Sequence, residues 1–283
     1  MSSEPAGNLR PARCPISGLD EARLIFSYDA PPKGEIGFRR PEGVPYRREI
    51  WQFAGSDHYV SRHAMAVAAD YDGEYVDATY GGLEGMARAF ERMIALPPER
   101  SDNAGRAKRV SDFARAYLLD TVRPRLLDVG AGLGVFPYAI KTMGWECAAI
   151  DPDARAVQHM KERVGVRAIQ GDFMKVEIDE RFDILTFNKV LEHVPDPIAM
   201  LRRAGRFLAD GGFVYLELPD GEMAACEGAG REEFFIEHLH VFSFASIAML
   251  AKAAGFTPRL VERLHEPSTK FTLRAVLAAA NPP

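Results

Sequence analysis

Residues 126–134 combine the pattern of a buried strand with three glycines spaced as in a ligand-binding turn. The run reads Leu-Leu-Asp-Val-Gly-Ala-Gly-Leu-Gly, and its glycines are Gly130, Gly132 and Gly134. Glycine lets the backbone bend tightly and lets a ligand approach where a side chain would block it. Asp128 adds an acceptor at the carboxyl end of the strand. The pattern predicts a nucleotide-like cofactor at the N-terminus of the following helix, and the alternative is an ordinary glycine-rich loop.

An acidic residue follows the next expected strand, residues 146–150. Asp151 stands at the position, about 20 residues after the glycine turn, where an acid binds the ribose hydroxyls of a nucleotide. Its neighbour Asp153 is suited to cap the next helix. The two roles are compatible, so Asp151 is a candidate ribose ligand.

A third expected strand, residues 166–170, runs into Gly171-Asp172-Phe173. Asp172 could accept a hydrogen bond from an adenine amino group, and the ring of Phe173 could lie on the adenine. Taken alone, this tripeptide is an ordinary turn. In register with the two earlier strand ends it completes a site, because open α/β sheets bind ligands at the carboxyl ends of their strands.

The fourth expected strand, residues 182–187, leads into a loop that begins at Asn188 and contains Glu192-His193. A neutral imidazole near pH 7 is well suited to remove a proton from an attacking hydroxyl. His193 is therefore the first candidate for a general base. The alternative is that His193 packs and forms hydrogen bonds around the cofactor.

Together these motifs resemble those of the class I S-adenosylmethionine (SAM)-dependent methyltransferases. Gly-x-Gly-x-Gly directly after Asp-x resembles their first motif, whereas a dinucleotide site would have a small residue where Val135 stands. Leu-Glu-His-Val-Pro-Asp-Pro at 191–197 is similar to the small-molecule branch of the family, in which this loop faces the transferred methyl group. The resemblance implies SAM as the cofactor, bound by the three strand ends and the loop from Asn188.

Ubiquinone-type O-methyltransferases resemble this loop, but they carry a further acid three residues before the Glu-His pair that helps to hold a divalent metal. In this chain that position is Lys189. Because an ammonium group repels a metal ion, we expect no metal at this site.

Residues 232–243 hold two further histidines, His238 and His240, in a chain that has seven. On an extended segment these two side chains share one face. They could supply a second base, a substrate contact or half of a metal site, although two histidines do not define a metal site. The alternative is a solvated loop edge. Ser243 and Gly255 have the positions of the N-cap and the C-terminal glycine of the next helix.

Arg106 lies just before the helix that leads into the first core strand, and in the family resembled this helix passes over the amino-acid end of the cofactor. A guanidinium group suits two-point contact with a carboxylate, so Arg106 is a candidate for the methionine carboxylate of SAM. The alternative is a surface arginine on a helix that is capped by Ser101 or Asp102. Further candidates, for substrate contact, are Tyr75, Tyr80 and Glu84.

The alternation of strands and helices predicts an α/β fold: a Rossmann-like, seven-stranded, mostly parallel sheet with helices on both faces. We expect a reversed final hairpin within 259–278. The predicted SAM-binding core covers 103–283, and residues 1–102 form an N-terminal extension with ribbon-like and helical segments. Apolar spacing predicts paired helices over 83–96 and 106–119 that pack on the core and cover the site.

The start of the extension resembles a zinc-ribbon leader found before some sugar- and polysaccharide-modifying methyltransferases. In that leader, paired Cys-x-x-Cys turns bind zinc. Here Cys14 is present, while Ser17, Phe53 and Ser56 stand where three cysteines are expected. Because a structural zinc site needs four ligands, we expect a ribbon-like fold without metal. The alternative is a generic proline-rich leader.

Composition excludes several classes of function. A net charge of −5 argues against a long nucleic-acid interface. No apolar run approaches the roughly 18 residues of a membrane span, and the first residues lack the pattern of a signal peptide. Three cysteines form no disulfide framework and suit a reducing, cytoplasmic location.

The sequence thus predicts a SAM-dependent methyltransferase that acts on a small molecule or a sugar-type intermediate, most simply at a hydroxyl group. His193, His238 or His240 would supply the base. N- or C-methylation and a homodimer stay open. The alternatives are a non-catalytic SAM-fold partner or sensor, and an NAD-linked oxidoreductase.

Overall fold

The larger of two sheets has seven strands. The computed structural model describes residues 9–35, 37, 43–65, 81–119 and 121–280, and the candidates Tyr75 and Tyr80 lie outside them. The strand order is β10-β11-β8-β7-β4-β5-β6, in which β4 to β8 run parallel and β10 and β11 form the expected reversed hairpin. This confirms the predicted fold class. The strands are β4 Arg125–Val129, β5 Glu146–Asp151, β6 Arg167–Gln170, β7 Phe182–Asn188, β8 Leu208–Pro219, β10 Phe256–His265 and β11 Phe271–Ala279.

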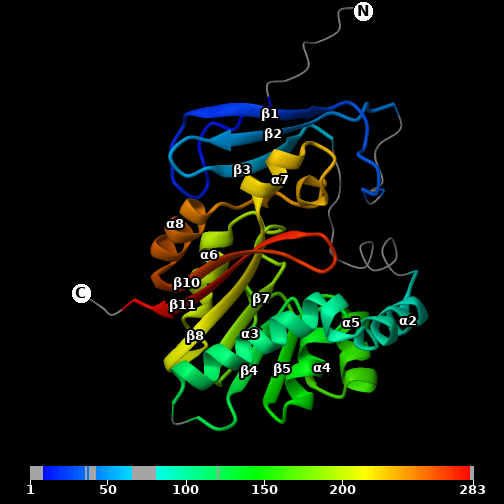
Figure 1. Ribbon diagram of the computed structural model, residues 1–283, viewed down its shortest axis with the longest axis vertical. Helices are drawn as coiled ribbons and strands as arrows, with labels where there is room; N and C mark the ends of the chain where they lie inside the picture. The colour runs from blue at the N-terminus through cyan, green and yellow to red at the C-terminus, as the bar shows by residue number, and fades with distance from the viewer. Residues whose placement is uncertain (1–8, 36, 38–42, 66–80, 120, 281–283) are drawn as a thin grey trace, which may run out of the picture.

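Helices cover both faces of this sheet (Figure 1). Side chains of α3 and α4 pack with the sheet in one apolar cluster, and those of α6 and α8 pack in another. The central strands are buried on both faces, which is why their sequences are almost continuously apolar. The helices are α3 Asp102–Tyr117, α4 Val135–Thr142, α5 Ala154–His159, the π-helical turn η2 Met160–Val164, α6 Pro197–Ala204 and α8 Phe244–Ala254.

Helix ends follow the predicted capping residues. The side chain of Asp153 accepts from the backbone N–H of Arg155 at the start of α5. Ser243 forms a capping box with Ser246 at the start of α8, and Gly255 ends that helix in the left-handed conformation, with φ 88°. These local contacts set where the two helices begin, at the carboxyl edge of the sheet, and where α8 ends.

The two helices that were predicted as a pair have different neighbours. Helix α2, Leu83–Ile94, packs against α5 and α4, whereas α3 packs mainly against α4. Met86 and Phe90 of α2 join the apolar cluster that contains Leu133 of the glycine turn. The helix before α3, η1, spans Pro98–Arg100. The extension therefore contacts the predicted cofactor turn through α2.

The smaller sheet is antiparallel, with the order β1-β2-β3-β9. Its first three strands come from the extension, but β9 follows the segment that carries His238. The predicted division of the chain into an extension, 1–102, and a core, 103–283, stays a proposal. The small sheet contains strands from both parts. Its strands are β1 Ala22–Tyr28, β2 Arg48–Phe53, β3 His58–His63 and β9 His240–Val241, and α7 Gly221–Glu227 and η3 Glu232–Phe234 lie beside it.

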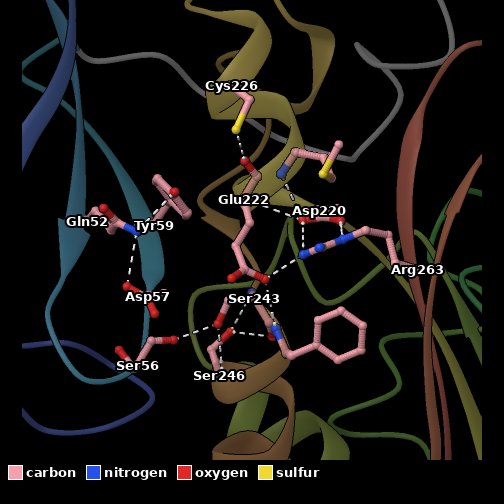
Figure 2. Close-up of polar contacts among 12 residues, drawn as sticks. Gln52, Ser56, Asp57, Tyr59, Asp220, Glu222, Cys226, Ser243, Ser246 and Arg263 are labelled. Atoms are coloured by element: carbon pink, nitrogen blue, oxygen red, sulfur yellow. Dashed lines mark hydrogen bonds and ion pairs between the residues drawn. The ribbon is translucent and has the colours of Figure 1, made fainter.

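Polar contacts join the two sheets (Figure 2). Asp220 caps α7 and also binds the guanidinium of Arg263 on β10. The hydroxyl of Ser243 donates to the carbonyl of Ser56, between β2 and β3, at 2.6 Å. A Cβ at Gly221 would come within 2.4 Å of the Tyr59 ring. The small sheet is therefore packed tightly against the core.

Three of the four positions that resemble zinc-ribbon ligands lie together. The Sγ atom of Cys14 is 3.7 Å from the hydroxyl of Ser56, which lies 3.4 Å from that of Ser17. Phe53 is fully buried in the same apolar cluster as Cys14. The likeness to a zinc ribbon stays a resemblance, and the contacts explain how thiol, hydroxyl and aromatic groups hold this turn.

A buried ion pair anchors the segment that leads to His238. Arg48 is fully buried on β2, and its guanidinium bonds Glu35 at 2.9 Å, Tyr46 at 2.8 Å and the carbonyl of Phe234. Glu35 also accepts from the backbone N–H of Ile236 at 2.8 Å. The extension thus holds the backbone two and four residues before His238.

We expect Arg48→Met to lower the free energy of unfolding by about 3–5 kcal/mol, because it leaves the Glu35 carboxylate buried and unpaired. The measurement is urea denaturation. Arg47→Met is the matched control: the Arg47 side chain is 39% exposed, and its partner Glu49 keeps the hydrogen bond from the Trp51 ring N–H, so the change should cost at most about 1 kcal/mol. Equal losses in the two variants would contradict the anchoring role.

Candidate active site

The glycines at 130–134 form the turn between β4 and α4. Gly130 and Gly132 have φ values of 69° and 52°, in the left-handed region that favours glycine. A Cβ at Gly130 would lie 2.8 Å from Val190, whereas a Cβ at Gly132 would meet nothing within 4 Å. One side of the turn is thus packed while the backbone at Gly132 faces open space, as the approach of a ligand requires.

Asp151 ends β5 directly beside this turn. One carboxylate oxygen accepts from the N–H of Gly132 and the other from the N–H of Asp153, both at 2.9 Å. Burial raises the pKa of Asp151, and these two backbone bonds act in the opposite direction. An ionised carboxylate has about four acceptor positions, so Asp151 retains the capacity to bind two hydroxyl groups.

Asp128 and Asn188 lie side by side at the ends of β4 and β7. Asp128 accepts from the hydroxyl of Thr186 at 2.6 Å and from the amide of Asn188 at 2.8 Å. Burial raises the pKa of Asp128 to about 7. Among the described residues, the amide oxygen of Asn188 is buried without a hydrogen-bond partner. It is an acceptor at the edge where the cofactor was predicted.

The structure separates the two parts of the predicted adenine motif. Asp172 is exposed after β6, where it accepts from the N–H of Met174 at 2.8 Å, and its role toward adenine stays a proposal. Phe173 is buried, with ring centroids 5.6 Å from Phe187 and 5.5 Å from Phe207. Its ring belongs to the core, because β7 and the segment after α6 supply an apolar pocket for it. It is not a free surface for adenine.

Arg106 faces the site, but its charge is already paired. Two of its nitrogens donate to one carboxylate oxygen of Glu217 on β8. Burial alone would raise the pKa of Glu217, but Arg106 and Arg274 lower it to about 2. The expected contact with a methionine carboxylate would therefore compete with a buried ion pair, and Arg106 serves first to fix α3 on the sheet.

Asn103, one turn before Arg106, was missed by the sequence reasoning. Its amide nitrogen donates to the carbonyl of Val135 at 3.2 Å, and its amide oxygen is buried without a partner in the described part of the chain. The signal in the sequence was a polar residue in the first turn of the helix that precedes the glycine motif. We add Asn103 to the candidate cofactor residues.

His193 and His238 come together at the end of β7. Their ring centroids are 4.9 Å apart. The Nδ1 atom of His193 lies 2.9 Å from the carbonyl of Glu237, and that of His238 lies 2.8 Å from the carbonyl of Glu233. Because a carbonyl only accepts, each Nδ1 carries the proton, and Nε2 is the basic nitrogen of each neutral ring.

Glu192 completes this cluster and was not among the predicted site residues. Ligand atoms of Glu192, His193 and His238 lie within 4.8 Å of one another. Within the described residues, both carboxylate oxygens of Glu192 are buried without a hydrogen bond, and burial raises its pKa to about 7. The backbone carbonyl of Glu192 accepts from the N–H groups of Leu239 and His240, which brings the two segments together.

His240 does not share the site with His238, contrary to the prediction from an extended segment. It enters β9, where its Nδ1 lies 3.1 Å from Nε2 of His58. Both rings are buried, and burial lowers the pKa of His240 to about 4. His240 therefore packs in the joint between the sheets, and we remove it from the candidate bases.

Comparison with known proteins identifies the family. Residues 87–261 match the sequence family described as the methyltransferase domain, which is more than half of the chain. The chain belongs to this methyltransferase family. Membership confirms the predicted enzyme class and its cofactor, SAM. None of the described helices of this methyltransferase is long and apolar enough to cross a bilayer.

The curated relatives resemble part of the methyltransferase. Ubiquinone biosynthesis O-methyltransferase of Pseudomonas putida strain KT2440 is 36% identical over 98 residues, which cover 32% of this chain and 42% of the relative. The Pseudomonas aeruginosa enzyme of that name, strain LESB58, is 35% identical over 99 residues. The match thus spans less than half of the length of these relatives.

Solved structures share the fold at low sequence identity. The glycopeptide N-methyltransferase MtfA aligns with a TM-score of 0.50 at 15% identity, over 63% of this chain and 90% of that protein. Magnesium protoporphyrin IX methyltransferase of Synechocystis PCC 6803 aligns with a TM-score of 0.50 at 13% identity, over 67% and 94% of the two chains. These likenesses concern the fold alone.

The residues at the sheet edge fit SAM. The open backbone at Gly132 leaves room for a ligand, and the Asp151 carboxylate beside it suits the ribose hydroxyls. The unpartnered amide oxygens of Asn103 and Asn188 are acceptors suited to the ammonium of the methionine end. The methyltransferase thus has hydrogen-bond acceptors suited to both the ribose hydroxyls and the methionine ammonium of SAM.

Proposed function

We propose that this methyltransferase transfers the methyl group of SAM to a hydroxyl group of a small-molecule acceptor. Phenols and the sugar hydroxyls of glycan-type intermediates belong to this class. The names of the ubiquinone relatives support the choice of oxygen. SAM, when bound, supplies an electrophilic methyl group, and side chains of this protein supply the base.

The observation that carries the proposal is the cluster of Glu192, His193 and His238 at the end of β7. Transfer to oxygen is fastest when the hydroxyl proton is removed as the bond forms. The carbonyls of Glu237 and Glu233 hold each ring with Nε2 as the proton acceptor. Nε2 of His193 or His238 would accept the proton of the acceptor hydroxyl, while the oxygen would bond to the methyl group as its bond to the sulfonium of SAM breaks and S-adenosylhomocysteine leaves.

Glu192 has a supporting role in this scheme. Its Oε1 lies 4.0 Å from Nε2 of His193, so an ionised Glu192 stabilises the imidazolium that forms when the histidine takes the proton. Since burial raises the pKa of Glu192 to about 7, this stabilisation is present above that pH and is lost as the pH falls below it. We therefore expect the rate to fall on the acid side of neutrality.

The same three groups could serve a metal ion, but we assign them to acid–base chemistry. Lys189 lies in the same loop, and its positive charge acts on Glu192 and on both histidines. A divalent cation in the cluster would be repelled by this ammonium. We therefore propose transfer without a metal.

The test is transfer of labelled methyl from SAM to a panel of phenols and sugar intermediates, each paired with the corresponding amine. We expect product from hydroxyl acceptors and no loss of rate with EDTA. Transfer to amines alone, or a rate that collapses with EDTA and returns with Mg²⁺ or Zn²⁺, would contradict the proposal.

Two rival functions predict other outcomes. A non-catalytic SAM-fold partner or sensor would bind S-adenosylhomocysteine (SAH) tightly without turnover on any acceptor. An NAD-linked oxidoreductase would be stabilised in thermal denaturation by NAD and not by SAM. The same purified protein serves for all three measurements.

A further inference from the structure

The segment 229–241, which carries the second candidate base, is bonded to the N-terminal extension at both of its ends. The hydroxyl of Tyr28 on β1 donates to the carbonyl of Ala229 at 2.9 Å. Near the other end, the N–H of Ser61 on β3 donates to the carbonyl of Leu239 at 3.1 Å, just before β9 pairs with the same strand. The path of this segment therefore depends on strands of the extension.

The middle of the segment is held by the buried pair of Glu35 and Arg48. The Arg48 guanidinium donates to the carbonyl of Phe234, and Glu35 accepts from the N–H of Ile236 at 2.8 Å. The two side chains bond each other at 2.9 Å and are 0% and 1% exposed. The hydroxyl of Tyr46 donates to Glu35 at 2.6 Å and accepts from Arg48 at 2.8 Å. The pair is thus bonded on several sides, which fixes the backbone that it holds.

The backbone groups next to these two anchored positions orient both candidate bases. The carbonyl that lies 2.8 Å from Nδ1 of His238 belongs to Glu233, one residue before the first anchored position. The carbonyl that lies 2.9 Å from Nδ1 of His193 belongs to Glu237, one residue after the second. Each bond favours the tautomer with a proton on Nδ1 and a basic Nε2. A shift of the anchored backbone would therefore move a carbonyl that orients a base.

Apolar contacts seat the same segment on the small sheet. The ring of Phe234 is fully buried, with its centroid 5.2 Å from that of Phe26 on β1 and 5.7 Å from that of Tyr59 on β3. In the described part of the chain, neither Glu35 nor Arg48 forms a hydrogen bond with a histidine. Their effect on the bases therefore has to pass through the backbone of the segment.

We propose that Glu35 and Arg48 are positioning residues of the methyl-transfer site, which hold the backbone whose carbonyls orient His193 and His238. The proposal rests on the function proposed above, because it gives the extension a part in orienting the base. A displacement of about 1 Å in a reacting group can lower a rate about 100-fold. A small shift of these two carbonyls would therefore be enough to slow the transfer.

The test follows the ring nitrogen signals of His193 and His238 by NMR in the whole chain saturated with SAH. In the wild type we expect both neutral rings to carry the proton on Nδ1. In Glu35→Ala the N–H of Ile236 loses its acceptor, and we expect the two rings to show a mixture of tautomers. With an active acceptor, kcat should fall about 10–100-fold, while the KM for SAM stays within a few-fold of the wild type.

Two further variants separate positioning from stability. In Glu35→Gln an amide oxygen can still accept from the N–H of Ile236, so this variant should retain the wild-type tautomers although the charge of the pair is lost. Ile16→Ala is the control for a loss of stability alone. Ile16 is buried in the extension, so its truncation destabilises the fold, but its side chain cannot bond to the segment 229–241. Its ring signals should match those of the wild type.

Wild-type tautomers in folded Glu35→Ala would overturn the proposal, and so would an equal change in Ile16→Ala. If Glu35→Ala fails to fold, Arg48→Lys takes its place, because one ammonium cannot span Glu35, Tyr46 and the carbonyl of Phe234 as the planar guanidinium does. Unchanged rings in that variant would overturn the proposal equally. The readout needs no turnover, so a failure of the proposed function, with no product from any hydroxyl acceptor, is seen separately.

Discussion

Replacement of Asp151 by asparagine is expected to weaken SAH binding about 100-fold or more. The carboxylate accepts from Gly132 and Asp153 and retains acceptor positions for two ribose hydroxyls. Hydrogen bonds to a charged group contribute about 1.5–3 kcal/mol each, and asparagine removes the charge and turns one acceptor atom into a donor. The measurement is isothermal titration calorimetry with SAH.

Asp153→Asn is the matched control for this variant. Asp153 is also buried and caps α5, but asparagine is an equally good N-cap residue. We expect its SAH affinity to stay within a few-fold of the wild type. If Asp151→Asn bound as tightly as Asp153→Asn, the cofactor would not use the end of β5, and the assignment of the whole edge would be wrong.

Replacement of the proposed general base should have the second large effect. For His193→Gln and His238→Gln we expect kcat to fall about 10²–10⁴-fold in whichever variant removes the base, with a smaller loss in the other. Glutamine is similar in length to histidine but has no basic nitrogen that could take the proton. SAH affinity should change little, because a general base contacts the acceptor hydroxyl and not the cofactor.

His265→Gln is the control, because His265 is exposed on β10 and stacks on Phe271. Its kcat should match the wild type. Full activity in both His193→Gln and His238→Gln would show that transfer needs no imidazole base. Equal loss of SAH affinity and kcat would instead assign the two rings to cofactor binding, which is the alternative that the sequence left open.

The cofactor edge was the most predictable part of the molecule. Gly130 and Gly132 lie within one strand–turn–helix unit, and the distance to Asp151 is set by the length of one helix and one strand. Ser243 and Gly255 delimit α8 through contacts that span a few residues. In such cases the residue type by itself predicts the local structure, because only glycine adopts the turn at low cost and only a few side chains cap a helix.

The partners of charged and aromatic side chains were not predictable in this way. Arg106 pairs with Glu217, 111 residues further along the chain, and nothing local distinguishes that partner from a cofactor carboxylate. Phe173 could equally have faced adenine, but the packing of β7 and the segment after α6 buries its ring. Which of these outcomes occurs depends on surfaces that exist only after the sheet has formed.

The sequence by itself determined the α/β fold and the methyl donor, and it placed the glycine turn beside Asp151 at one edge of the sheet, since local backbone geometry and period-dependent apolar patterns specify them. Only the tertiary structure decided which side chains form the proposed base cluster. His240 is separated from His238 because it belongs to β9, which pairs with β3 of the small sheet. His238 lies beside His193 and Glu192 because the backbone N–H groups of the next two residues donate to the carbonyl of Glu192. Tertiary packing decides which side chains from distant parts of the sequence come into contact, and this packing cannot be inferred from any single segment.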